Sequence, residues 1–305
     1  MNASKITFII KALKKWAGLL LFIICIVSIY FQVGQHPNLN LYKKELFLQL
    51  SHIDYWQWFI LLLLMILNLS MEAIKWRIIL KERSSPSFLH SLKSIFIGQA
   101  FAFYTPNRIG EYLGRTLHIP AENKLDALSK MAWTSYAQLL ITIVIGSIAV
   151  FIQPPFLIWI KWSTPFILFG ALFVYFQQIQ FSGWVSFLNV LQIPTTVKTS
   201  LLSISLLRYI VFLAQYYWVA QCLHMDIPFL DFWVAIAVLF LCLSILPTIS
   251  ITELVVRGQL ILLLFAPFYQ NTMLLIGLST IVWVVNLLIP AIIGSFLLLN
   301  FKLKE

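Results

Sequence analysis

The chain has 305 residues, of which 61% are hydrophobic and only 10% are charged, and its mean hydropathy is +0.90. Soluble domains carry roughly 25% charged residues, so this composition excludes a water-soluble protein. Apolar runs of about 20 residues recur along the chain and predict an all-α, polytopic helical membrane protein. The runs are continuous and do not alternate with period two, which disfavours a transmembrane β-barrel.

The net charge of +10 comes from 21 Lys and Arg against 11 Asp and Glu. Most of the basic residues flank apolar segments, where the positive-inside bias and anionic lipid headgroups explain them better than nucleic acid does. We therefore expect membrane lipids as partners, no nucleic acid, and a multi-pass location in the plasma (inner) membrane. The three cysteines, Cys25, Cys222 and Cys242, lie in apolar runs and are expected to be buried packing residues.

The apolar runs give the order of the spans. Residues 16–33 follow four lysines and predict a first span with a cytoplasmic N-terminus, not a cleaved signal peptide. The mixed segment 34–55 predicts an outer loop. Further spans are predicted at residues 56–80, 131–152, 156–177, 199–223, 232–246, 259–268 and 272–301. Together they make eight crossings in one integral membrane domain over residues 1–305, with both termini cytoplasmic.

A cluster of charges interrupts this apolar pattern at residues 103–117. Its charged members are Arg108, Glu111 and Arg115. The apolar run before them, residues 94–104, is too short to cross a bilayer at 1.5 Å per residue. Thr105 is typical of an N-cap, and Pro106 of the first helical position. We therefore predict a re-entrant hairpin over residues 88–118, whose broken backbone must be covered by protein or by a water-filled cavity.

The segment around Pro247 repeats the order proline, acid, arginine, with Glu253 and Arg257. In both segments the arginine lies four positions after the acid, which favours a helical ion pair. Ser250 and Glu253 form a capping-box pattern in a second broken segment over residues 232–270. Helix N-termini at membrane depth favour an anion. Paired interruptions of opposite orientation indicate an inverted repeat with a transport-type site between them.

These charges also have a simpler interpretation. Each Glu–Arg pair can merely neutralise itself, since a buried arginine costs about 2.5–3.5 kcal/mol in a membrane helix. Arg208 is either a third cationic wall or a residue that snorkels to an interface, and Glu72, paired with Lys75, is expected to stabilise the end of the second span. For the two segments together we favour a lipid- or substrate-binding site. Its residues are Arg108, Glu111, Arg115, Arg208, Glu253 and Arg257.

Motifs for catalysis are missing from the sequence. The five histidines are scattered without metal-ligand spacing, and no P-loop, dinucleotide fingerprint or paired-aspartate motif occurs. We therefore expect no catalytic residues, no cofactor and no metal, and do not expect an enzyme.

Three segments carry a family resemblance: Glu72-Ala-Ile-Lys-Trp-Arg77, Tyr104-Thr-Pro-Asn-Arg-Ile-Gly-Glu111 with Arg115, and residues 247–258. They resemble the transmembrane, flippase-like domain of lysylphosphatidylglycerol synthetases and its stand-alone relatives. The second is the most specific, because it is similar to the Pro-x-Arg-x-Gly-Glu hairpin of that family. The third departs from the family pattern: no Glu follows Arg257, the usual glycines are missing, and Glu253 lies upstream.

The resemblance covers most of the chain and implies a lipid translocator or lipid-binding module. The soluble aminoacyl-transferase domain of the synthetases has no counterpart here, so lipid lysylation is not implied. We expect a flippase-like protein that binds or moves an anionic or glycosylated lipid between leaflets, with Arg108, Arg115 and Arg257 on the phosphate. Glu111 and Glu253 would orient these arginines or contact a cationic headgroup. The alternatives are a non-transporting scaffold that works with envelope- or polysaccharide-assembly proteins, and a membrane transferase that uses Glu111 or Glu253 as base.

Overall fold

The computed structural model describes residue 23 and residues 25–34, 37–80, 86–105, 108–117, 119–152, 158–176, 193–246 and 248–299. Nearly all of these residues are helical, and none of them lies in a β-strand. Residues 16–22 and 24 of the first predicted span lie outside the described residues, as do Pro106 and Pro247 at the two predicted breaks.

Four helical stretches in the described part are long and apolar enough to cross a membrane: Tyr55–Leu80, Asp126–Ile152, Thr195–Cys222 and Thr272–Leu299. Their 26 to 28 residues extend about 39–42 Å at 1.5 Å per residue, more than the roughly 30 Å of a bilayer's hydrocarbon core. Shorter apolar helices accompany them: Cys25–Gly34, Thr164–Phe176 and Phe229–Ile245. The structure is therefore consistent with a helical membrane protein, while eight crossings remain a prediction.

The outward and inward faces of these helices differ in side-chain packing, as expected for a protein surrounded by lipid. Large apolar side chains stand exposed on the outside, among them Phe59 on α3 (Tyr55–Leu80) and Phe166 and Phe169 on α7 (Ile158–Phe176). Lipid tails solvate such side chains, whereas water would not. The inward faces form a close-packed core of small, aliphatic and aromatic residues, for example Ala73, Trp76, Tyr216, Leu239 and Phe265.

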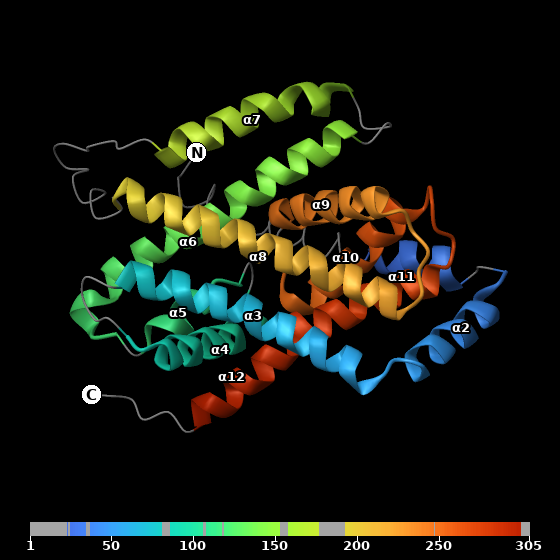
Figure 1. Cartoon of the computed structure of the whole chain (residues 1–305), viewed down its shortest axis with the longest axis horizontal. Helices are drawn as coiled ribbons and strands as arrows, with labels where there is room; N and C mark the ends of the chain where they lie inside the picture. Colours follow the sequence, from blue (N-terminus) through green and yellow to red (C-terminus); the bar gives the residue numbers. More distant parts are fainter. Residues whose placement is uncertain are drawn as a thin grey trace, which may run out of the picture.

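The centre of the molecule is a pair of long helices, α3 and α8 (Thr195–Cys222), which lie side by side (Figure 1). A third long helix, α6 (Ala121–Ile152), packs against both of them. At one edge α7 packs on α6. At another edge the short helix α2 (Leu39–Ser51) packs against α11 (Thr272–Trp283) (Figure 1).

Two short helices, α4 (Phe88–Tyr104) and α5 (Gly110–Thr116), fold back on each other in antiparallel orientation beside α3. Glycines allow their backbones to touch. A Cβ on Gly114 would lie 2.8 Å from the Cα of Gly98, and one on Gly110 would lie 2.4 Å from the carbonyl oxygen of Phe101. The chain thus reverses direction between the two helices. That this hairpin enters the membrane and leaves it on the same side remains a prediction.

The last span is interrupted by a π-helical turn, η4 (Val284–Leu288), which joins α11 (Thr272–Trp283) to α12 (Ile289–Leu299). Pro290 lacks an N–H and cannot complete the regular helical hydrogen bond, so a local π-turn accommodates it. Beyond this turn α12 packs against α4. A Cβ on Gly294 would stand only 1.9 Å from the carbonyl oxygen of Phe96, so the two helices meet backbone to backbone.

Two further helices complete the bundle. The α9 helix (Phe229–Ile245) packs on α6, and α10 (Ser250–Phe265) packs on α9 and α11. Leu246, Thr248 and Ile249, between these two helices, are not helical. The predicted second broken segment therefore contains two separate helices.

Two connections differ from the sequence prediction. The predicted outer loop at residues 34–55 contains the helix α2, which the sequence did not predict because its composition is polar. Leu46 of α2 packs on Gly277 of α11, where a Cβ would lie 2.8 Å from Leu46 Cδ1. The predicted span at residues 131–152 is longer, because α6 already begins at Ala121. An Asp126–Lys130 ion pair of 3.3 Å supports this extension at helical i,i+4 spacing.

Candidate functional site

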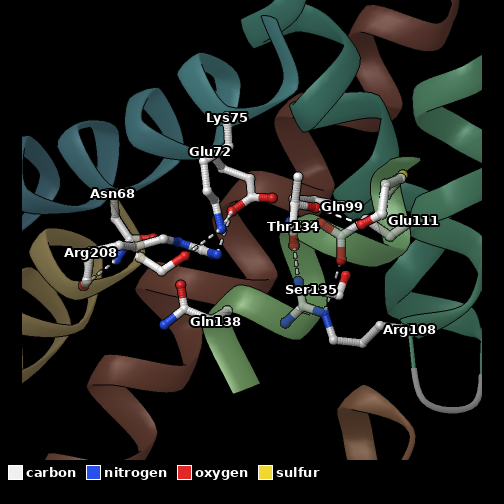
Figure 2. Close-up of polar contacts among 12 residues, drawn as sticks. Asn68, Glu72, Lys75, Gln99, Arg108, Glu111, Thr134, Ser135, Gln138 and Arg208 are labelled. Atoms are coloured by element: carbon white, nitrogen blue, oxygen red, sulfur yellow. Dashed lines mark hydrogen bonds and ion pairs between the residues drawn. The ribbon is translucent and has the colours of Figure 1, made fainter. Parts of the chain in front are cut away.

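The polar centre of the structure is the carboxylate of Glu72 on α3, which is 4% exposed. Three cations from three helices reach it. The Nζ of Lys75 lies 2.9 Å from Oε2, an Nη of Arg115 on α5 lies 2.8 Å from Oε1, and an Nη of Arg208 on α8 lies 2.5 Å from Oε2. Figure 2 shows Glu72 and Lys75 on one side of this meeting point and Arg208 on the other. One carboxylate therefore ties α3, α5 and α8 together.

A second carboxylate, Glu111, joins the hairpin to the same set of contacts. Arg115 pairs with Glu111 through its other Nη, so that one guanidinium bridges both carboxylates. Arg108 Nε lies 3.5 Å from Glu111 Oε2. Gln99 on α4 donates to Glu111 at 3.2 Å and accepts a hydrogen bond from Arg108. The six linked charged side chains, Glu72, Lys75, Arg108, Glu111, Arg115 and Arg208, are here called the Glu72 network.

Arg108 gives this network its access to the surface. Its side chain is 35% exposed, whereas that of Arg115 is 2% exposed. Its φ of 57° lies in the left-handed region, which residues other than glycine seldom adopt and which is often found at functional sites. Pro106, the predicted first helical position, lies outside the described residues. Thr105 terminates α4, and its hydroxyl accepts a hydrogen bond of 2.8 Å from the N–H of Gly110, where α5 begins.

The Glu72 network is not electrically balanced. It contains four cations and two carboxylates, so two positive charges are in excess. It also contains an unused donor, because the buried Nε of Arg115 has no hydrogen-bond partner among the described residues. The Oε1 of Gln138 on α6 has none there either, but it is an acceptor and does not favour an anion. In the view of Figure 2 the Gln138 amide lies between Arg208 and Arg108. The excess charge and the unused donor suit an anionic ligand, since an uncompensated buried ion costs several kcal/mol.

Four of the six predicted site residues meet in this network, namely Arg108, Glu111, Arg115 and Arg208. The residue that sequence reasoning undervalued is Glu72. Its predicted pairing with Lys75 is confirmed, but its larger role is to bind Arg115 and Arg208 as well. A signal was available, because a carboxylate inside an apolar spanning helix is rare and usually paired or functional. Asn68, one turn earlier on α3, supports the same contact by accepting from Arg208 Nε at 2.8 Å.

Glu253 and Arg257 form a separate and smaller site. Arg257 pairs with Glu253, as the spacing predicts, and donates a hydrogen bond to the buried hydroxyl of Tyr216 on α8. One cation and one carboxylate leave this pair neutral. The predicted Ser250–Glu253 capping box is wrong, because α10 follows Ile249, whose N–H donates to the Thr252 hydroxyl at 3.0 Å.

Trp283 stands between the two breaks. Its indole N–H donates to the carbonyl oxygen of Ser250 at 2.9 Å, and its ring centroid lies 5.9 Å from that of Phe103 on α4. The end of α4 and the start of α10 therefore approach one tryptophan. Even so, no ion pair within the described ranges connects Arg257 or Glu253 to the Glu72 network.

Fold and site together are consistent with a helical membrane protein that holds a buried, positively charged network where α3, α5 and α8 meet. Comparison with protein-family models, with characterised proteins and with solved structures finds no match to this chain. The resemblance to the lysylphosphatidylglycerol synthetase membrane domain therefore remains a prediction.

Proposed function

We propose that this protein binds the phosphate headgroup of an anionic lipid at the Glu72 network and moves that lipid between leaflets. The observation that carries the proposal is the excess of positive charge in a buried network. Arginine suits phosphate because its planar fork presents parallel N–H donors. The three arginines come from different elements: Arg108 from the turn before α5, Arg115 from α5 and Arg208 from α8.

The surface beside Arg108 suits the acyl chains of such a lipid. Tyr104, Ile109 and Leu113, which surround the turn in sequence, are all strongly exposed apolar or aromatic side chains. A ligand whose phosphate contacts Arg108 can therefore rest its hydrocarbon chains against the outer face of the hairpin. An amphiphile uses both features, whereas a free anion uses only the charge.

The two carboxylates have a role in the transport cycle that this function implies. A site that releases its ligand must not leave its arginines buried without a counter-ion. Glu72 and Glu111 compensate part of the charge of Arg115, Arg208 and Arg108 when no ligand is bound, and the headgroup compensates the remainder.

A non-transporting membrane scaffold is the second candidate, and one observation favours it. Glu72, Glu111 and Glu253 are all ion-paired with arginine, so the same contacts serve equally to fasten helices together. The pairing of Glu111 and Glu253 also counts against a transferase in which either one serves as base.

Leaflet exchange of a labelled anionic lipid in proteoliposomes tests the proposal. We expect Arg108→Ala to abolish exchange while the protein remains folded, because Arg108 is the exposed entry to the network and not a core residue. Lys93→Ala is the matched control, since Lys93 is an exposed cation on α4. Normal exchange by the Arg108 variant contradicts translocation through this site and favours the scaffold.

A further inference from the structure

We infer that the phosphate bound at the Glu72 network is a monoester carrying two negative charges, and not a diester carrying one. The inference rests on the proposed function and adds the chemical class of the lipid headgroup. It depends on the size of the charge excess, on the neutrality of the surrounding ion pairs and on the donors that remain free.

The size of the excess follows from the ion pairs. Glu72 is shared by Lys75, Arg115 and Arg208, and Glu111 by Arg115 and Arg108. Two carboxylates balance two of the four cations, so two positive charges remain. Lys75, Arg115 and Arg208 are largely buried, whereas the side chain of Arg108 is 35% exposed and borders the surface. Because buried ions are most stable when paired, the favoured ligand is one that enters beside Arg108 and brings the network to neutrality. A phosphate diester leaves one cation uncompensated, whereas a phosphate monoester compensates both.

Among the described side chains, two acids on neighbouring helices already form ion pairs of their own. On α6, Asp126 pairs with Lys130 at helical spacing, and on α10, Glu253 pairs with Arg257. Each of these pairs is neutral in itself. The excess therefore belongs to the Glu72 network and is not cancelled by these two neighbouring pairs.

The donors that remain also match a monoester. A monoester presents three terminal oxygens as strong acceptors, whereas a diester keeps only two that are not bridging. Arg115 Nε is buried and has no hydrogen-bond partner in the described ranges, and Arg108 is the network's most exposed arginine. Arg208 reaches the same point from α8, where its Nη contacts Glu72. Arginines thus approach from three elements, which suits a group with three equivalent oxygens.

Native mass spectrometry of the full-length protein tests the inference directly. The detergent-solubilised protein is offered equal amounts of phosphatidate and phosphatidylglycerol with identical acyl chains. At about pH 7.5 the monoester headgroup of phosphatidate carries nearly two charges, because its second pKa is about 6. We expect phosphatidate to be retained about tenfold more than phosphatidylglycerol, as one additional charge-assisted contact implies.

Two substitutions change the charge excess in opposite directions. Arg108→Gln leaves one excess charge, and we expect the preference for phosphatidate to fall toward equality while phosphatidylglycerol is still retained. Glu111→Gln raises the excess to three, and the preference should persist or grow. Lys93→Gln removes the same charge as the first variant from an exposed position on α4, and should leave the ratio unchanged.

The outcomes separate this inference from the proposed function. Equal retention of both lipids by the unmodified protein, or an unaltered ratio in both network variants, overturns the monoester while anionic lipid binding stands. Retention of neither lipid contradicts the proposed function itself. A thermal-shift titration with inorganic phosphate identifies the source: stabilisation by phosphate, with no retained phosphatidate, supports a monoester-like dianion from solution and contradicts a lipid.

Discussion

The two breaks of this protein share an order of residues and differ in their surroundings. Each combines an acid with an arginine four positions later, and each forms that ion pair. At the first break Arg115 continues to Glu72, and through it to Arg208, which creates a network with surplus positive charge. At the second break Arg257 finds one further partner, the neutral hydroxyl of Tyr216. A local motif therefore sets the ion pair, while the neighbouring helices decide whether it joins a larger, positively charged network.

The largest expected effect comes from removing the central carboxylate of each site. Glu72→Leu leaves three cations without their shared partner, and we expect a loss of about 3–5 kcal/mol of folding free energy, as for a broken buried ion pair. Glu253→Leu leaves only Arg257 without its carboxylate, and Arg257 still donates a hydrogen bond to Tyr216. The loss of folding free energy should therefore be smaller. Thermal unfolding of both variants in detergent measures the difference. Equal losses would remove the distinction between the two sites.

A second contrast concerns the glycines of the two breaks. Gly114→Ala places a Cβ 2.8 Å from backbone that cannot move aside easily, so we expect destabilisation of about 1–3 kcal/mol. Gly258→Ala on α10 meets nothing closer than 3.9 Å, and alanine there should be neutral or stabilise the helix by up to about 1 kcal/mol. The melting temperatures of the Gly114→Ala and Gly258→Ala variants, each compared with that of the unmodified protein, measure this difference. A tolerated Gly114→Ala would mean that the hairpin is looser than its backbone contacts indicate.

The third contrast compares how much lipid the protein retains after substitution of an arginine at each break. Arg208→Gln removes a cation from the Glu72 network, and we expect retained phosphatidate to fall about tenfold, the effect of one lost charge-assisted contact. Arg257→Gln alters a neutral pair outside that network, so its loss should be smaller. Native mass spectrometry under identical lipid loading compares them. A greater loss with Arg257→Gln would move the ligand to the second break.

The smallest expected effect is a pH dependence that originates in the ligand. A phosphate monoester carries nearly two charges above its second pKa of about 6 and one charge below it. The preference for phosphatidate over phosphatidylglycerol should therefore be present at about pH 7.5 and decline severalfold at about pH 5.5. Phosphatidylglycerol retention, measured alongside, serves as the internal control. A ratio that rises on acidification is incompatible with a dianionic headgroup.

Local features were predictable from the sequence because they depend on nearby residues. Long apolar runs placed α3 and α8 within a few residues of their observed ends, and i,i+4 spacing anticipated both Glu–Arg pairs. The polar helix α2 was missed because its composition resembles that of a loop. The start of α5 was misplaced because Thr105 bonds to Gly110 across the turn.

The assembly of the candidate site could not be predicted in the same way. Glu72 contacts Arg115 and Arg208, which lie 43 and 136 positions further along the chain. No spacing rule connects residues so far apart, because only helix packing brings them together. Sequence reasoning could identify the charges as costly in a membrane, but it could not identify Glu72 as their common partner.

The backbone contact between Gly294 and Phe96 has a consequence for the order in which the molecule is made. The ribosome produces α4 and the hairpin charges long before it produces α12. Until α12 emerges, the face of α4 that it covers has no partner from this chain. The packing of the hairpin is therefore completed late in biosynthesis, and a nascent chain stalled before η4 should expose one face of α4 to the insertion machinery.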